Sequence, residues 1–291
     1  MSTKARTALL LTCFFWAISF VASKIALQHL PPVSVVTLRL IVSSFCFLFF
    51  FVRKRPGIPY RSLWPSLILL SLFGTGLHYT IQTFGLTMTS ASNAGVYAIT
   101  SPITITIIAR ILLKERLNPL KALGMLTALL GVVLVIGPDQ ISHFSLSGNM
   151  LGDLLVITSI FMWGIFTVLS KHYGSKLPPL SLTAAITFLG TAMMLPAGTW
   201  EFCRNPHSIL NAPAEAWLAI LFLGVTCSFL ATLFYLYALK DSESQKVGTY
   251  LYTIPPMTQL AAFLILGEPI VPVAILGMGL VLAGVWMTEK G

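Results

Sequence analysis

The chain has 291 residues, of which 56% are hydrophobic and only 9% are charged. A water-soluble domain carries about a quarter charged residues because its surface faces water, so this composition excludes a soluble globular protein. The net charge of +9 does not indicate nucleic-acid binding, since the basic residues lie in short gaps between apolar segments.

The apolar segments predict membrane-spanning helices. A bilayer core about 30 Å thick needs about 20 apolar residues per helix. The first such segment contains Lys24 and has no cleavage site, so we interpret it as an uncleaved span and not as a signal peptide. Ten segments are long enough, namely 7–28, 33–52, 64–86, 91–113, 119–137, 151–171, 180–200, 215–239, 247–267 and 270–288. We therefore expect an all-α integral membrane protein with ten transmembrane helices.

The basic residues predict the orientation of these spans, because cytoplasmic loops are enriched in Lys and Arg. Most of the 18 Lys and Arg residues lie in one set of alternate connections and near the two termini. The other set holds only Arg204, with Lys24 at a helix end and Arg39 inside the second span. Both termini are thus predicted to be cytoplasmic, which requires an even number of spans. We expect a multi-pass protein of the cell (inner) membrane.

The sequence contains an internal repeat. The residues from Trp16 read WAISFVASK, and those from Trp163 read WGIFTVLSK. A longer block, 95–132, aligns without gaps on 248–285, with charged, proline and tyrosine residues in register. Apolar composition alone does not explain matches of these polar types, so we interpret the pattern as a duplication.

The duplication predicts two five-helix repeats, residues 1–138 and residues 150–291. Five is an odd number, so the second repeat must cross the membrane in the opposite direction. Inverted repeats around a central site are typical of alternating-access transporters. The chain is therefore expected to hold two inverted repeats around a central cavity.

The chain resembles the drug/metabolite transporter superfamily, and within it the EamA-type ten-helix transporters. The residues that carry the resemblance are Trp16, Lys24, Pro32, Arg39, Pro102, Glu115, Arg116, Pro119, Gly124, Gly152, Asp153, Trp163 and Ser170. It covers nearly the whole chain and implies a basket-like bundle with a cavity between its halves. It says little about the substrate, since the family exports amino acids and many other metabolites.

Two tryptophans are candidates for contact with a solute. Trp16 and Trp163 lie mid-span and are repeat partners, so they either form aromatic walls of a site or pack helices 1 and 6 together. The other four tryptophans lie near span ends, where an aromatic belt explains them.

Prolines mark possible helix breaks. Pro102, Pro255 and Pro256 lie near the centres of the fourth and ninth spans. A proline removes a backbone donor, and broken helices often form the binding site of a transporter. A simple kink that shapes the bundle is the alternative. Tyr97 and Tyr250 lie one to two turns before these prolines and are predicted to flank the same region.

The third span carries His78, Tyr79 and Gln82. His78 and Gln82 are four residues apart and share a helix face. Polar groups cost free energy in hydrocarbon, so this face is predicted to point at the cavity or, alternatively, at a partner helix.

Charged residues suggest ion pairs near the two membrane surfaces. Lys24 and Asp153 lie towards the outer face and are candidates to pair. Repeat symmetry further suggests a gate in which Lys24 approaches Glu268 outside and Lys171 approaches Glu115 inside. Alternatively, the glutamates only mark span ends. Arg39 is expected to have a structural role, bound to helix-end carbonyls.

No carboxylate pair, nucleophile motif, metal-type cluster or phosphate-binding loop is present, so the sequence predicts neither an enzyme nor a cofactor. We expect a secondary transporter of small zwitterionic metabolites, most simply an amino-acid exporter. The alternatives are an organic-cation or drug transporter, a membrane-embedded enzyme and a non-transporting subunit. The expected partners are a small solute and the lipid bilayer, without nucleic acid or nucleotide, in a monomer or weak dimer.

Overall fold

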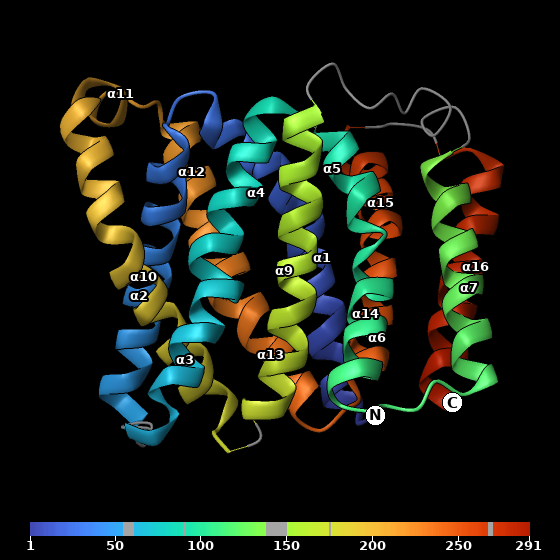
Figure 1. Ribbon diagram of the computed structural model, residues 1–291. Coiled ribbons are helices and arrows are strands. Elements are labelled where there is room, and N and C mark those ends of the chain that lie inside the picture. The colour runs from blue at the N-terminus through green and yellow to red at the C-terminus, as the bar shows by residue number, and fades with distance from the viewer. Residues whose placement is uncertain (55–60, 90, 138–149, 175, 267–269) are drawn as a thin grey trace.

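The computed structural model describes residues 1–54, 61–89, 91–137, 150–174, 176–266 and 270–291. All regular structure in these residues is helical. Figure 1 shows the long helices side by side, with both termini at the same end of the bundle. Eight described helices are long and apolar enough to cross a membrane, and Val96–Leu112 is a shorter apolar helix. The predicted all-helical membrane fold is confirmed, while the exact count of ten spans stays a prediction.

Several helices in the first half of the chain begin at a proline or at a capping side chain. Pro32 and Pro119 each open a helix, where a missing N–H costs nothing. The Asn118 side chain accepts a hydrogen bond from Lys121 N at 2.8 Å and caps the last of them. The elements are α1 (Thr3–Leu27), α2 (Pro32–Lys54), η1 (Arg61–Leu63), α3 (Trp64–Ser71), η2 (Leu72–Gly76), α4 (Leu77–Met88), α5 (Ala91–Ala98), α6 (Ser101–Leu112) and α7 (Pro119–Ile136).

The second half follows the same plan. Pro179 and Pro272 again stand at the start of long helices. The elements are α9 (Met150–Gly174), α10 (Pro179–Arg204), α11 (Pro206–Leu210), α12 (Ala214–Phe222), η3 (Leu223–Ala231), α13 (Thr232–Lys240), α14 (Ser244–Tyr250), η4 (Leu251–Thr253), α15 (Ile254–Leu266) and α16 (Pro272–Lys290).

Irregular segments lie between consecutive helices at four places in the described chain. The elements η2 and η3 are π-helical and join α3 to α4 and α12 to α13. A turn at residues 99–100 separates α5 from α6, and the 3₁₀ segment η4 separates α14 from α15. The turn at residues 99–100 and the segment η4 both adjoin the cavity described below, whose lining includes Ala98, Ser101, Leu251 and Ile254.

Contacts between the spans occur in matching sets. Helix α4 packs on α9 while α12, η3 and α13 pack on α1, and α6 packs on α9 while α15 packs on α1. Helices α2 and α10 pack together, as do α7 and α16. The α7–α16 contact is close because glycines face each other. A Cβ at Gly131 of α7 would lie 2.6 Å from the carbonyl oxygen of Gly277 of α16.

The largest buried cluster fills the half of the bundle on the side of the termini. It includes Leu9 of α1, Ile105 of α6, Phe166 of α9 and Leu239 of α13, each almost fully buried. This packed half leaves the centre of the bundle, beyond Trp16 and Trp163, as the place where a cavity forms.

Candidate functional site

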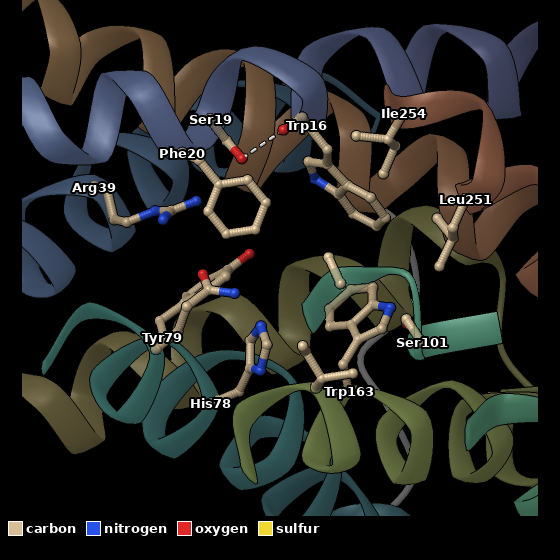
Figure 2. A pocket seen from close by; sticks show the side chains of 13 residues that line it. Trp16, Ser19, Phe20, Arg39, His78, Tyr79, Ser101, Trp163, Leu251 and Ile254 are labelled. Atoms are coloured by element: carbon tan, nitrogen blue, oxygen red, sulfur yellow. Dashed lines mark hydrogen bonds between the residues drawn. The ribbon is translucent and has the colours of Figure 1, made fainter. Parts of the chain in front are cut away.

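A cavity of about 100 Å³ lies at the centre of the bundle. Side chains from α1, α2, α4, α6 and α9 line it, together with residues next to the two helix breaks. Figure 2 shows that Trp16 of α1 and Trp163 of α9 line this space, with Arg39 and Tyr79 at one end. Pockets for drug-sized ligands usually have about 300–1,000 Å³, so this cavity matches a smaller molecule.

Trp16 and Trp163 make direct contact at the cavity wall. Their ring centroids are 5.0 Å apart with the planes at 89°, an edge-to-face arrangement. Tyr235 of α13 lies behind them, with its ring centroid 5.2 Å from that of Trp16 and 5.4 Å from that of Trp163. The tryptophans therefore pack α1 against α9 and also line the cavity. Tyr235, which the sequence did not single out, packs against both tryptophan rings.

The polar face of the third span points into the cavity, since His78, Tyr79 and Gln82 all line it. His78 Nδ1 lies 2.8 Å from the Ser159 carbonyl oxygen. A carbonyl only accepts, so Nδ1 carries the hydrogen and donates, and Nε2 of the neutral ring is an acceptor. The imidazole also contacts the ring of Trp163 at 5.3 Å between centroids. His78 thus offers one hydrogen-bond acceptor beside an aromatic wall.

Arg39 contacts other partners than the helix-end carbonyls expected from the sequence. Its Nε donates to Ser228 Oγ at 2.9 Å, and its guanidinium carbon lies 4.1 Å from the centroid of the Tyr79 ring. No helix-end carbonyl is among its partners in the described part of the chain. Arg39 is only 4% exposed and lines the cavity, where Figure 2 shows it pointing inward beside Phe20. A charge within an apolar span was the sequence signal that this side chain faces the interior of the bundle.

Tyr97 and Tyr250 do not line the cavity. Tyr97 packs with Leu86 at the end of the bundle away from the termini, and its hydroxyl interacts with the Asp153 carboxylate. The Tyr250 hydroxyl donates to Glu289 Oε2 at 2.9 Å near the C-terminus. The structure brings neither of these repeat partners to the predicted site.

The prolines stand just after the helix breaks. Pro102 is the second residue of α6 and Pro255 is the second of α15, followed by Pro256. In the first turn a proline leaves no donor unsatisfied within the helix. The cavity wall includes Ser101 and its repeat equivalent Ile254. Each break therefore contributes backbone and side chains to the cavity.

Lys24 and Asp153 meet through Thr89. The Lys24 ammonium donates to the carbonyl oxygens of Leu86 and of Thr89, the latter at 2.7 Å. The Thr89 hydroxyl donates to Asp153 Oδ1 at 2.7 Å. A direct Lys24–Asp153 pair is not among the ion pairs of the described residues. The ammonium therefore closes the end of α4, and the threonine links it to α9.

The predicted inner pair, Lys171 with Glu115, is not formed among the described ion pairs. The Glu115 carboxylate accepts from Ser244 N at 2.9 Å and Gln245 N at 3.2 Å, at the start of α14. Lys171 Nζ donates to carbonyl oxygens at the end of α13, including that of Lys240 at 2.7 Å. Helix starts attract negative charge and helix ends attract positive charge, so each residue binds backbone instead of the other.

The predicted outer pair cannot be placed, because Glu268 lies outside the described residues. The contacts of Lys171 and Glu115 differ from those of the predicted gate. Lys171 and Glu115 hold the two sides of the short connection between α13 and α14.

Comparisons with known proteins agree with this architecture. The EamA-like transporter family matches the chain at residues 3–137 and 150–289. An uncharacterized transporter of Archaeoglobus fulgidus is 32% identical over 289 residues, which cover 99% of this chain and 98% of the relative. A probable terminal-alkyne amino-acid exporter of Streptantibioticus cattleyicolor is 23% identical over 288 residues, covering 99% and 94%. A known crystal structure has a TM-score of 0.75 at 19% identity, covering 99% of this chain and 96% of the other, and thus has the same fold.

Proposed function

Because the chain belongs to the EamA-like transporter family, we propose that it is a secondary transporter that exports amino acids or related small metabolites. The observation that carries the proposal is the central cavity with its aromatic walls, Trp16 and Trp163, and its polar groups, His78 and Gln82. Apolar and aromatic walls with a few polar groups are typical of small-molecule sites. The relative from Streptantibioticus cattleyicolor, named a probable terminal-alkyne amino-acid exporter, supports this substrate class.

The proposed mechanism is alternating access between inverted repeats, residues 1–138 and 150–291. The matching contacts of α4 with α9 and of η3 with α1 support this division, as do the breaks at equivalent positions of the fourth and ninth spans. In such transporters the two halves rock around a fixed central site. The proposal includes cytoplasmic termini, an inner-membrane location and a monomer or weak dimer.

An organic-cation transporter is the alternative substrate class. A cation would be attracted to the faces of the aromatic rings through cation–π contacts. The described lining of the cavity, however, contains no acidic side chain and does contain Arg39. Repulsion in a site of low dielectric opposes binding of a cation. A membrane-embedded enzyme is the alternative of a different class, and the family and the transporter names of the relatives argue against it.

Counterflow in proteoliposomes tests the proposed function. The purified protein is reconstituted, loaded with each unlabelled amino acid, and assayed for uptake of the labelled form. We expect counterflow for at least one amino acid, reduced in Trp163→Ala and retained in Trp64→Ala, where the ring is 44% exposed. Counterflow of tetraalkylammonium ions without that of any amino acid would move the substrate to the cation class, and no counterflow of either would refute transport.

A further inference from the structure

The Arg39 guanidinium has unused hydrogen-bond donors inside the cavity. An arginine side chain has five N–H donors, and only Nε has an acceptor among the described residues, Ser228 Oγ at 2.9 Å. One face of the group is covered by the Tyr79 ring. The residue is nine-tenths buried, at 4% exposure, so its Nη donors have little access to bulk water. Neither Nη atom is among the fully buried, unpartnered side-chain atoms of the described residues, so both present accessible surface to the cavity, where an acceptor of a solute can reach them.

The charge of Arg39 is also uncompensated in the described part of the chain. The ion pairs among the described residues join Glu289 to Arg6 and to the N-terminus, Glu215 to His29, and Glu243 to Lys121. None includes Arg39, and no described side chain of the cavity wall is acidic. A buried charge without a counter-ion is unfavourable, because it loses hydration that no partner replaces. An anionic group of the solute would relieve this cost.

The shape of the site selects among anions. A guanidinium presents a planar fork that matches a carboxylate with two parallel hydrogen bonds. A phosphate group carries a charge of about −1.5 to −2 near neutral pH, which a single guanidinium does not neutralise. The remaining lining has no second cation. A carboxylate therefore fits the charge of the site better than a phosphate.

We propose that Arg39 binds the carboxylate of the transported solute and thereby restricts the substrates to small carboxylates and zwitterions. His78, whose ring contacts that of Tyr79 at 5.2 Å between centroids, supplies an acceptor for an ammonium group through Nε2. The aromatic walls take the apolar part of the solute. This inference rests on the proposed function and names the chemistry of the same cavity.

The bound carboxylate would also lie between the two halves of the chain. Arg39 is on α2 and Tyr79 on α4, both in the first half, whereas Ser228 is on η3 in the second half. A ligand held by Arg39 thus acts on a contact that joins the halves. Alternating access requires a site in such a position.

The test uses the full-length purified protein and thermal-shift titration. The twenty standard L-amino acids are titrated first, followed by the amide, the methyl ester and the decarboxylated amine of the one that binds best. Wild-type protein should bind the free acid and lose binding for all three derivatives. Arg39→Gln should weaken binding of the acid by about 30-fold or more, the range for truncating a buried charge pair. Inorganic phosphate should not shift the unfolding midpoint.

Three variants separate ligand binding from a structural role of Arg39. Arg39→Lys keeps the charge and should recover part of the affinity. Arg204→Gln is the matched control, because that arginine also stacks on an aromatic ring, Trp200 at 4.3 Å, outside the cavity. Ser228→Ala should lower the midpoint of the ligand-free protein while keeping the preference for acid over amide.

Equal affinity of wild-type protein for acid and amide would overturn the inference, and this measurement does not depend on the variants folding. Unchanged acid binding in a folded Arg39→Gln protein would also overturn it. If no amino acid binds but tetraalkylammonium ions show counterflow, the role of Arg39 fails while transport stands. If neither amino acids nor tetraalkylammonium ions bind or show counterflow, both the proposed function and the role of Arg39 fail.

Discussion

The substitution Trp163→Ala measures how much the central aromatic contact contributes. The side chain is 7% exposed and its ring contacts those of Trp16, His78, Phe166 and Tyr235, with centroids between 4.9 and 5.4 Å apart. Replacing a buried tryptophan by alanine costs about 3–5 kcal/mol. We expect a loss of this size in the free energy of unfolding, together with weaker solute binding, because the same ring forms the cavity wall. Thermal unfolding in detergent and a binding titration measure the two effects.

The matched control is Trp286→Ala, where the ring is 61% exposed on α16. An exposed substitution changes stability by about 0.5 kcal/mol or less, so both measurements should stay near wild type. Trp163→Phe keeps an aromatic ring and should recover part of both losses. Equal losses in stability and binding for Trp163→Ala and Trp286→Ala would refute the assignment of a central aromatic wall.

Three further predictions concern packing, the α14 cap and topology. Gly131→Ala places a Cβ 2.6 Å from a backbone oxygen of α16 and should cost about 1–3 kcal/mol of unfolding free energy. Gly279→Ala, with nothing within 4 Å, should change it little. Glu115→Ala removes the acceptor at the start of α14, which should lower the free energy of unfolding by about 1 kcal/mol. It should also increase the labelling of a cavity cysteine, placed by Ser101→Cys, from the cytoplasmic side. Unchanged labelling would show that Glu115 contributes to stability alone and does not affect which side of the cavity is open. Reporter fusions should read cytoplasmic after Arg116 and external near Asn205, and the reverse result would contradict the orientation.

The helices were predictable from the sequence because their limits depend on local chemistry. The length of the apolar segments placed the long helices within a few residues of their observed ends. The π-helical segments η2 and η3 were not predicted. They depend on how neighbouring helices fit together, which an apolar sequence with few polar markers does not encode.

Residues that line the cavity were predictable where polar side chains had to avoid lipid. They were not predictable where contacts between distant segments of the chain set the direction of a side chain. His78 and Gln82 share a helix face, so one orientation exposes both to the cavity. Arg39 could have faced either neighbour of α2, and only its contact with Ser228, far along the chain, fixes its direction. Tyr250 was predicted to flank the site because it lies one to two turns before Pro255 and Pro256. It binds Glu289 instead, a partner that the sequence repeat could not reveal.

The most direct test of the central claim is the accessibility of Ser101, which lines the cavity beside the break between α5 and α6. A Ser101→Cys substitution in a chain without its native cysteines is treated with an impermeant maleimide in right-side-out and inside-out vesicles. Alternating access predicts labelling from both sides and protection by the transported solute. Labelling from one side only, with no effect of the solute, would contradict a central site that opens in turn to each face of the membrane.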